Sequence, residues 1–149
     1  MNKVTLTKAN FDLWTLIGRT NHTIVSLRQK ELSRYHIPVR QLYVLRTIRD
    51  HGSKATLSEV ATIVERETHV ISKQAIRMEK DGLIKRVKNT PKSNLLELQL
   101  TEKGREMAKI SEQSNALDLL FSTLSEEEHK QIESILKKVL LQAKKMASV

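Results

Sequence analysis

Apolar side chains recur at helical spacing between residues 57 and 80, and this is the clearest pattern in the chain. In residues 68–80, Ile71, Ala75 and Met78 stand at i, i+4 and i+7, so they form one apolar side of a short helix. The opposite side carries polar and basic residues, namely Thr68, His69, Ser72, Lys73 and Arg77. A DNA major groove admits a short helix of this kind when another helix packs behind it. The pattern therefore predicts a winged helix-turn-helix.

A long helix is predicted over residues 7–35. Its apolar stripe consists of Phe11, Trp14, Ile17, Ile24, Leu27 and Leu32. We expect Arg19, Arg28 and Lys30 on its other face. The helix should end before Pro38, because the residue that precedes a proline avoids helical backbone.

Two further helices should follow before residue 68. Pro38 suits the first turn of a helix that runs to about Asp50. The inward side chains of that helix are expected to be Leu42, Leu45 and Ile48. Residues 56–59 (TLSE) are a capping-box pattern, so a short third helix should begin there. Its expected buried residues are Leu57, Val60, Ala61 and Val64.

A β-hairpin is predicted after Gly82, the glycine expected to end the helix over residues 68–80. Residues 83–87 favour a short strand, and residues 89–94 (NTPKSN) carry turn chemistry. Residues 95–100 alternate with period two, which places Leu96, Leu98 and Leu100 on the packed face.

The C-terminal part is expected to form two helices, one from Thr101 to about Thr123 and one after a second capping box at residues 125–128. They carry more apolar surface than so small a chain can cover, which favours a symmetric dimer; an ordinary core is the alternative. The predicted fold is mainly α with a small β-hairpin wing in a single compact chain. Residues 37–100 would form the winged DNA-binding domain, and residues 1–36 with 101–149 a helical dimerisation region.

Charge adds a candidate partner to this picture. The chain has 149 residues and a net charge of +9, and the excess of basic groups lies in residues 1–92. A one-sided positive field suits a polyanion such as double-stranded DNA, although a solvated surface is the alternative. The absence of cysteine excludes disulfides and thiolate zinc sites. No apolar run is long enough to span a membrane and no signal peptide precedes the first helix, so we expect a cytoplasmic protein.

Catalytic and metal-binding patterns are missing from the sequence. The five histidines lack metal-ligand spacing, and no nucleophile elbow or phosphate-cradling glycine loop is present. We therefore expect no metal, no cofactor and no enzyme activity.

Four motifs resemble the MarR family of bacterial transcriptional regulators: residues 37–48 (IPVRQLYVLRTI), 57–61 (LSEVA), 78–84 (MEKDGLI) and 100–104 (LTEKG). The resemblance covers nearly the whole chain. It implies a homodimer on a pseudo-palindromic operator, with the first helix and the two C-terminal helices as the dimerisation module. It also implies a small aromatic or anionic effector that releases a repressor. The family's wing tip is usually rich in Asp and Arg, whereas this sequence has Lys92 and Asn94 at the matching positions. The ammonium group of lysine lacks the planar, several-donor geometry of the arginine guanidinium.

Site residues follow from the pattern and from the resemblance together. Base edges are expected to be contacted by Thr68, His69, Ser72 and Lys73. Arg77 is expected to contact the sugar–phosphate backbone of the DNA. Phosphate contacts are expected from Arg86, Lys88 and Lys92 of the hairpin, with Arg40 and Ser58 at helix N-termini. An effector cleft would include Trp14, His22, Tyr43 and Arg46, for which core packing or a surface position is the alternative. The rival function is a winged-helix protein–protein adaptor without sequence-specific DNA binding.

Overall fold

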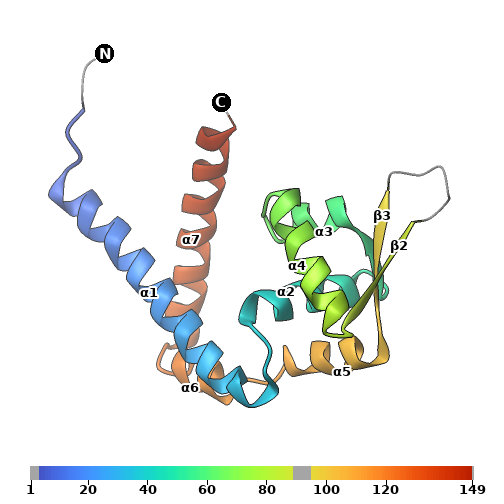
Figure 1. The fold of residues 1–149 in the computed structure, drawn as a ribbon. Coiled ribbons are helices and arrows are strands. Elements are labelled where there is room, and N and C mark those ends of the chain that lie inside the picture. The colour runs from blue at the N-terminus through green and yellow to red at the C-terminus, as the bar shows by residue number, and fades with distance from the viewer. Residues whose placement is uncertain (1–3, 89–94, 149) are drawn as a thin grey trace. The chain divides into compact units, whose positions relative to one another are not determined.

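The computed structural model describes residues 4–88 and 95–148, which divide into two compact units, Met1–Ser114 and Asn115–Val149 (Figure 1). The first unit contains α1 (Lys8–Leu32), the 3-10 turn η1 (Ser33–Tyr35), α2 (Val39–Asp50), β1 (Lys54–Thr56), α3 (Leu57–Ile63), α4 (Thr68–Lys80), β2 (Ile84–Lys88), β3 (Leu96–Leu100) and α5 (Glu102–Ile110). The second unit contains α6 (Asn115–Phe121) and α7 (Glu126–Ala147). None of the helices in residues 4–88 and 95–148 is long and apolar enough to cross a membrane.

The core of the first unit lies among α2, α3, α4 and a three-stranded antiparallel sheet of order β1-β3-β2. Leu98 of β3 stands opposite Ala55 of β1 and Arg86 of β2. Ile71, Ala75 and Met78 of α4 are buried, as the apolar spacing predicted. Figure 1 shows β2 and β3 side by side as the predicted hairpin.

Local sequence signals place most helix ends where they were expected. Thr56 and Ser125 each form a capping box, with Glu59 and Glu128 as the reciprocal partners. Gly82 adopts a φ of +75°, the left-handed backbone that a glycine tolerates without strain. Pro38 precedes α2 as its N-cap, one residue before the helical position expected for it.

β1 was not predicted. It is only three residues long and exists through its pairing with β3. It widens the hairpin into a sheet and joins the end of α2 to the start of α3, which fixes the helices of the winged domain to the wing.

The prediction of one helix from Thr101 to about Thr123 is wrong, because α5 ends at Ile110 and α6 begins at Asn115. Arg28 explains the interruption. Its guanidinium donates hydrogen bonds to the carbonyl oxygens of Gln113 and Ile110, at 2.8 and 2.9 Å. Arg28 was expected on the open face of α1, but it is buried and pairs there with Glu31.

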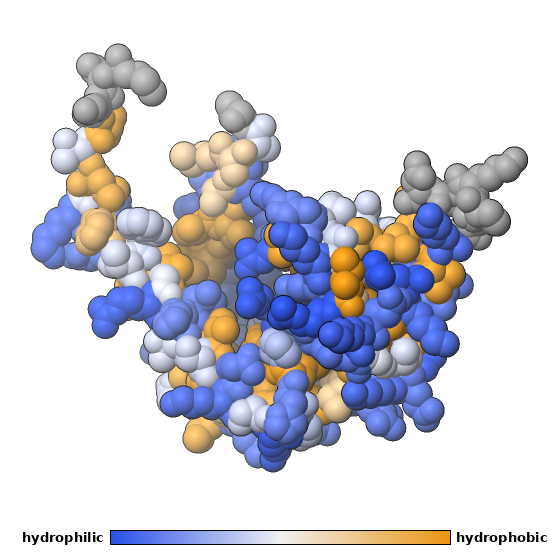
Figure 2. Space-filling model, viewed as in Figure 1, coloured by the Kyte–Doolittle hydropathy of each residue, from blue (hydrophilic) through white to orange (hydrophobic). Residues whose placement is uncertain are grey.

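The apolar stripe of α1 is largely exposed within its own unit. Leu32 is fully buried at the end of the helix, whereas Phe11, Trp14 and Ile17 are exposed. In the second unit, no residue of α7 is buried. Figure 2 shows apolar side chains over much of both helices. The assignment of residues 37–100 to a DNA-binding domain, and of residues 1–36 and 101–149 to a dimerisation region, stays a prediction.

Candidate nucleic-acid interface

The outward flank of α4 is polar and basic, as the spacing predicted. Thr68, His69, Lys73 and Arg77 are exposed, and Ser72 is half-buried at the edge of the same flank. His69 Nδ1 lies 3.1 Å from a carboxylate oxygen of Glu67, the residue that precedes the helix. A helix that buries one side and presents hydroxyl and cationic groups on the other can contact base edges and phosphates.

α3 supports α4 from behind. Val60 and Ala61 of α3 are buried in the shared core, and Ser58 is exposed near the first turn of α3. The backbone N–H of Thr56 donates to Glu59 at 2.8 Å, which lowers the pKa of that carboxyl. Ser58 is exposed there, and its contact with a phosphate stays a prediction.

The C-terminal end of α4 is attached to α5 through three consecutive carbonyl oxygens. Lys103 Nζ donates to the Asp81 oxygen at 2.9 Å, and the Thr101 hydroxyl donates to the Gly82 oxygen at 2.6 Å. The Thr101 backbone N–H donates to the Leu83 oxygen at 3.1 Å. These bonds fix the direction of α4 relative to the rest of its unit.

A hollow of about 260 Å³ lies between the N-terminus of α2 and the flank of α4. Its lining residues are Pro38, Arg40, Gln41, His69, Val70, Lys73, Gln74 and Arg77. Three of them are permanent cations and none is acidic, and the positive end of the α2 dipole adds to the field. The hollow therefore suits an anion such as a phosphate group.

Gln74 is a residue of this hollow that the sequence did not single out. Its Oε1 atom is buried and has no hydrogen-bond partner among the described residues. Gln74 follows Val70 by four residues, so both lie on one side of α4. This spacing was the only sequence signal that could have indicated the place of Gln74 in the hollow.

The wing residues differ in their surroundings. Arg86 lies 3.0 Å from Glu79 of α4 through its guanidinium, and its backbone N–H donates to the same carboxylate at 2.8 Å. This backbone bond, together with the side-chain bond, lowers the pKa of Glu79. Lys88 is exposed, with no ion pair in the described part of the chain. Lys92 lies outside the described residues.

The four residues expected at an effector cleft are all exposed, and none of them lines the hollow beside α4. Trp14 packs edge-on against Phe11, and Arg46 pairs with Asp50 at 3.6 Å. His22 and Tyr43 lie on the open faces of α1 and α2. The assignment of these four residues stays a prediction.

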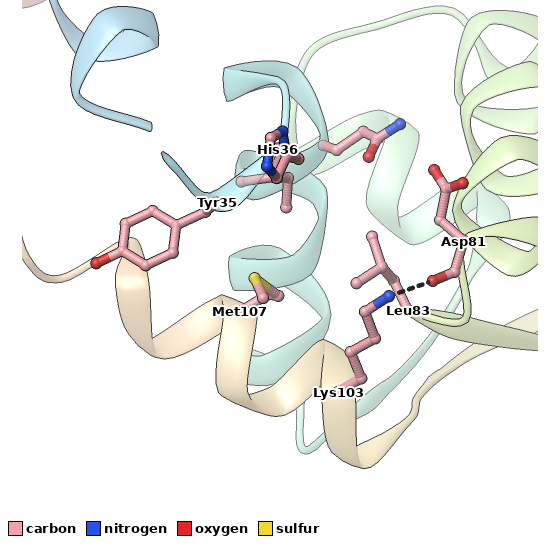
Figure 3. A pocket seen from close by; sticks show the side chains of 8 residues that line it. Tyr35, His36, Asp81, Leu83, Lys103 and Met107 are labelled. Carbon is pink, nitrogen blue, oxygen red and sulfur yellow. Dashed lines mark hydrogen bonds between the residues drawn. The ribbon is translucent and has the colours of Figure 1, made fainter. Parts of the chain in front are cut away.

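A second hollow of about 360 Å³ lies between η1, α2, α5 and the end of α4. Its lining residues are Tyr35, His36, Ile37, Gln41, Asp81, Leu83, Lys103 and Met107. Figure 3 shows Lys103 reaching from α5 to the main chain of Asp81 across this hollow. Within residues 4–88 and 95–148, no three His, Asp or Glu side chains gather as metal ligands.

The three helices α2–α4 and the antiparallel sheet define a winged helix-turn-helix. Residues 37–91 match the model of the MarR family. The resemblance to that family that the motifs indicated is therefore confirmed over this segment.

Several solved structures share the fold of this chain. One is the organohalide-sensing regulator RdhR-CbdbA1625 bound to 2,4-dichlorophenol, with 24% identity over 93% of this chain and 83% of that one, and a TM-score of 0.81. A mutant of MarR from E. coli in complex with operator DNA has 24% identity over 92% and 99%, with a TM-score of 0.80. The S. aureus MepR–DNA complex has 22% identity over 87% and 96%, with a TM-score of 0.78. The curated proteins include no match to this chain.

Proposed function

We propose that this protein is a sequence-specific DNA-binding transcriptional regulator that acts as a homodimer on a pseudo-palindromic operator. The observation that carries the proposal is the exposed flank of α4, where hydroxyl and cationic side chains adjoin a hollow lined by Arg40, Lys73 and Arg77 without any acidic group. α4 would enter the major groove, and Arg40 would hold a phosphate beside it.

The similar structures support DNA as the partner. Two of the regulators that share this fold, MepR and MarR, were solved in complex with DNA. A net charge of +9 favours the same partner, because cations that neutralise phosphates release condensed counterions.

Exposed apolar surface supports the homodimer. In α7, Ile132, Leu136 and Val139 recur at i, i+4 and i+7 and are exposed. In α1, Phe11, Trp14 and Ile17 repeat at intervals of three and are exposed as well. Contiguous apolar surface of this kind marks an interface, and a two-fold pair of subunits buries it on both copies at once.

A ligand-responsive repressor is the form of regulation that we propose. The dimer would exclude polymerase from its operator, and a small aromatic or anionic molecule would release it by changing the spacing of the two winged domains. The similar RdhR-CbdbA1625 was solved with a chlorinated phenol, which supports an aromatic effector.

Selection of bound sequences from a random duplex pool tests the proposal. The regulator should enrich a two-fold-related site, and Lys73→Ala should lower the preference for that site over random DNA by about 1–3 kcal/mol. Lys109→Ala, which removes the same charge from an exposed position on α5, is the matched control and should leave the preference unchanged. A protein that enriches no sequence would be the adaptor instead, with its basic face turned to an acidic partner.

A further inference from the structure

Ile76 is an exposed apolar residue on the otherwise polar flank of α4. Its side chain is 52% exposed. All residues of α4 are described by the structure, and no other large apolar residue of this helix is exposed. It follows Ser72 by four residues, Lys73 by three and His69 by seven, so it lies on the same side of the helix as all three. Figure 2 shows that this part of the molecule is predominantly hydrophilic.

The position of Ile76 along α4 places it directly after the residues that are expected to contact bases. Each residue advances a helix by about 1.5 Å, so Ile76 lies roughly one turn beyond Ser72. Lys73 and Arg77 flank it and are exposed. If α4 occupies a major groove, Ile76 faces the base edges and not solvent.

An isoleucine has no hydrogen-bond donor or acceptor in its side chain, so it can distinguish bases only by apolar contact. In the major groove, thymine alone among the four bases presents a methyl group, at C5. The other bases would place polar groups against the isoleucine. Those groups would lose their hydrogen bonds to water and gain none from the protein, which disfavours these bases at that position.

We infer that Ile76 is a specificity-determining residue that selects thymine by packing against its C5 methyl group. This inference rests on the proposed function, and it adds the identity of a base that the operator must contain in each half-site. Ser72 and Lys73 then supply hydrogen bonds to the neighbouring base pairs.

Replacement of thymine by uracil in the selected operator tests the inference, because it removes the C5 methyl group and keeps every hydrogen-bonding group. Wild-type protein should bind the uracil-containing half-site about fourfold more weakly for each packed methyl group that is removed. Ile76→Ala should bind the two DNAs with equal affinity, and Ile76→Val should retain part of the difference. Ile63→Ala is the matched control: this isoleucine is also 52% exposed but lies on α3, and its loss should leave the uracil effect intact.

The outcomes separate this inference from the function on which it rests. Wild-type protein that prefers its operator and binds the uracil form equally well would overturn the role of Ile76 alone. Full uracil sensitivity in Ile76→Ala would overturn it as well. Binding that is no tighter to the operator than to random duplex would overturn the proposed function, and the inference with it.

Discussion

Basic side chains around α4 differ in whether a carboxylate already neutralises them. Arg86 is paired with Glu79 through both its guanidinium and its backbone. Arg40, Lys73 and Lys88 have no ion pair within the described residues, so their charges are available to phosphates. Charge count alone would treat these four residues as equal, and their local contacts show that they are not.

Salt dependence measures this difference. Lys88→Ala should weaken binding to operator and random duplex alike and lower the slope of log affinity against log salt by about 0.9. Arg86→Ala should change the slope less, because Glu79 already offsets that charge. Fluorescence anisotropy at several salt concentrations gives both slopes, and a larger drop for Arg86→Ala would refute the assignment.

Acid stability should report the contact of Glu79 with β2. Its pKa is lowered from the ordinary 4.5 by the Arg86 backbone N–H and then by the Arg86 side chain. A carboxyl whose pKa is lower in the folded state stabilises the fold above its unfolded pKa, and this stabilisation is lost as the pH falls through the folded value. Glu79→Gln should therefore reduce the loss of unfolding free energy on acidification below about pH 4.5, measured by urea denaturation. Glu106→Gln, at an exposed position of α5, is the control; an unaltered profile for Glu79→Gln would contradict the account.

The outward residues of α4 were predictable from the sequence, because the helical spacing of its buried apolar residues also determines which residues lie on the opposite, exposed side. Arg28 was not, because its burial depends on carbonyl groups that lie more than eighty residues away along the chain. Gln74 and Ile76 were missed for a different reason: neither residue type signals DNA contact until the exposed or buried state of its atoms is known.

The close approach of α5 to the turn after α4 depends on Gly104. A Cβ atom at this position would lie 2.0 Å from the main-chain oxygen of Leu83, so a methyl group there must displace backbone. Gly18 of α1 has open space around its Cβ direction and is the natural comparison.

Gly104→Ala should destabilise the fold by about 1–3 kcal/mol, because it forces α5 away from the turn. Gly18→Ala should instead stabilise it by about 0.5–1 kcal/mol, since alanine costs less entropy than glycine within a helix. Thermal unfolding followed by circular dichroism compares the two, and a neutral Gly104→Ala would contradict the packing described.

Two features of element order were beyond sequence patterns. β1 has three residues and one buried side chain, too little for a period to be recognised, and it forms through pairing with β3 over forty residues away. The break after α5 contains neither glycine nor proline, and Arg28 of α1 binds the carbonyl oxygens at that point. Elements with caps and long periods were predictable, and elements defined by distant partners were not.

Binding to a two-fold operator, as proposed, depends on a second copy of the chain. Leu136→Lys places a charge within the exposed apolar stripe of α7, so it should shift the protein to monomer in sedimentation equilibrium and abolish binding to the two-fold operator. Ser134→Lys adds the same charge to the opposite side of α7 and should remain dimeric. Equal behaviour of the two variants would show that this stripe is not the interface.

Protection of guanine N7 atoms from dimethyl sulfate on the selected operator would show directly whether α4 enters the major groove, because N7 faces that groove. We expect two protected clusters that are related by a two-fold axis and separated by about one helical turn, or about 10 base pairs. Protection at a single cluster, or none while the protein remains bound, would contradict the insertion of two α4 helices into successive major grooves.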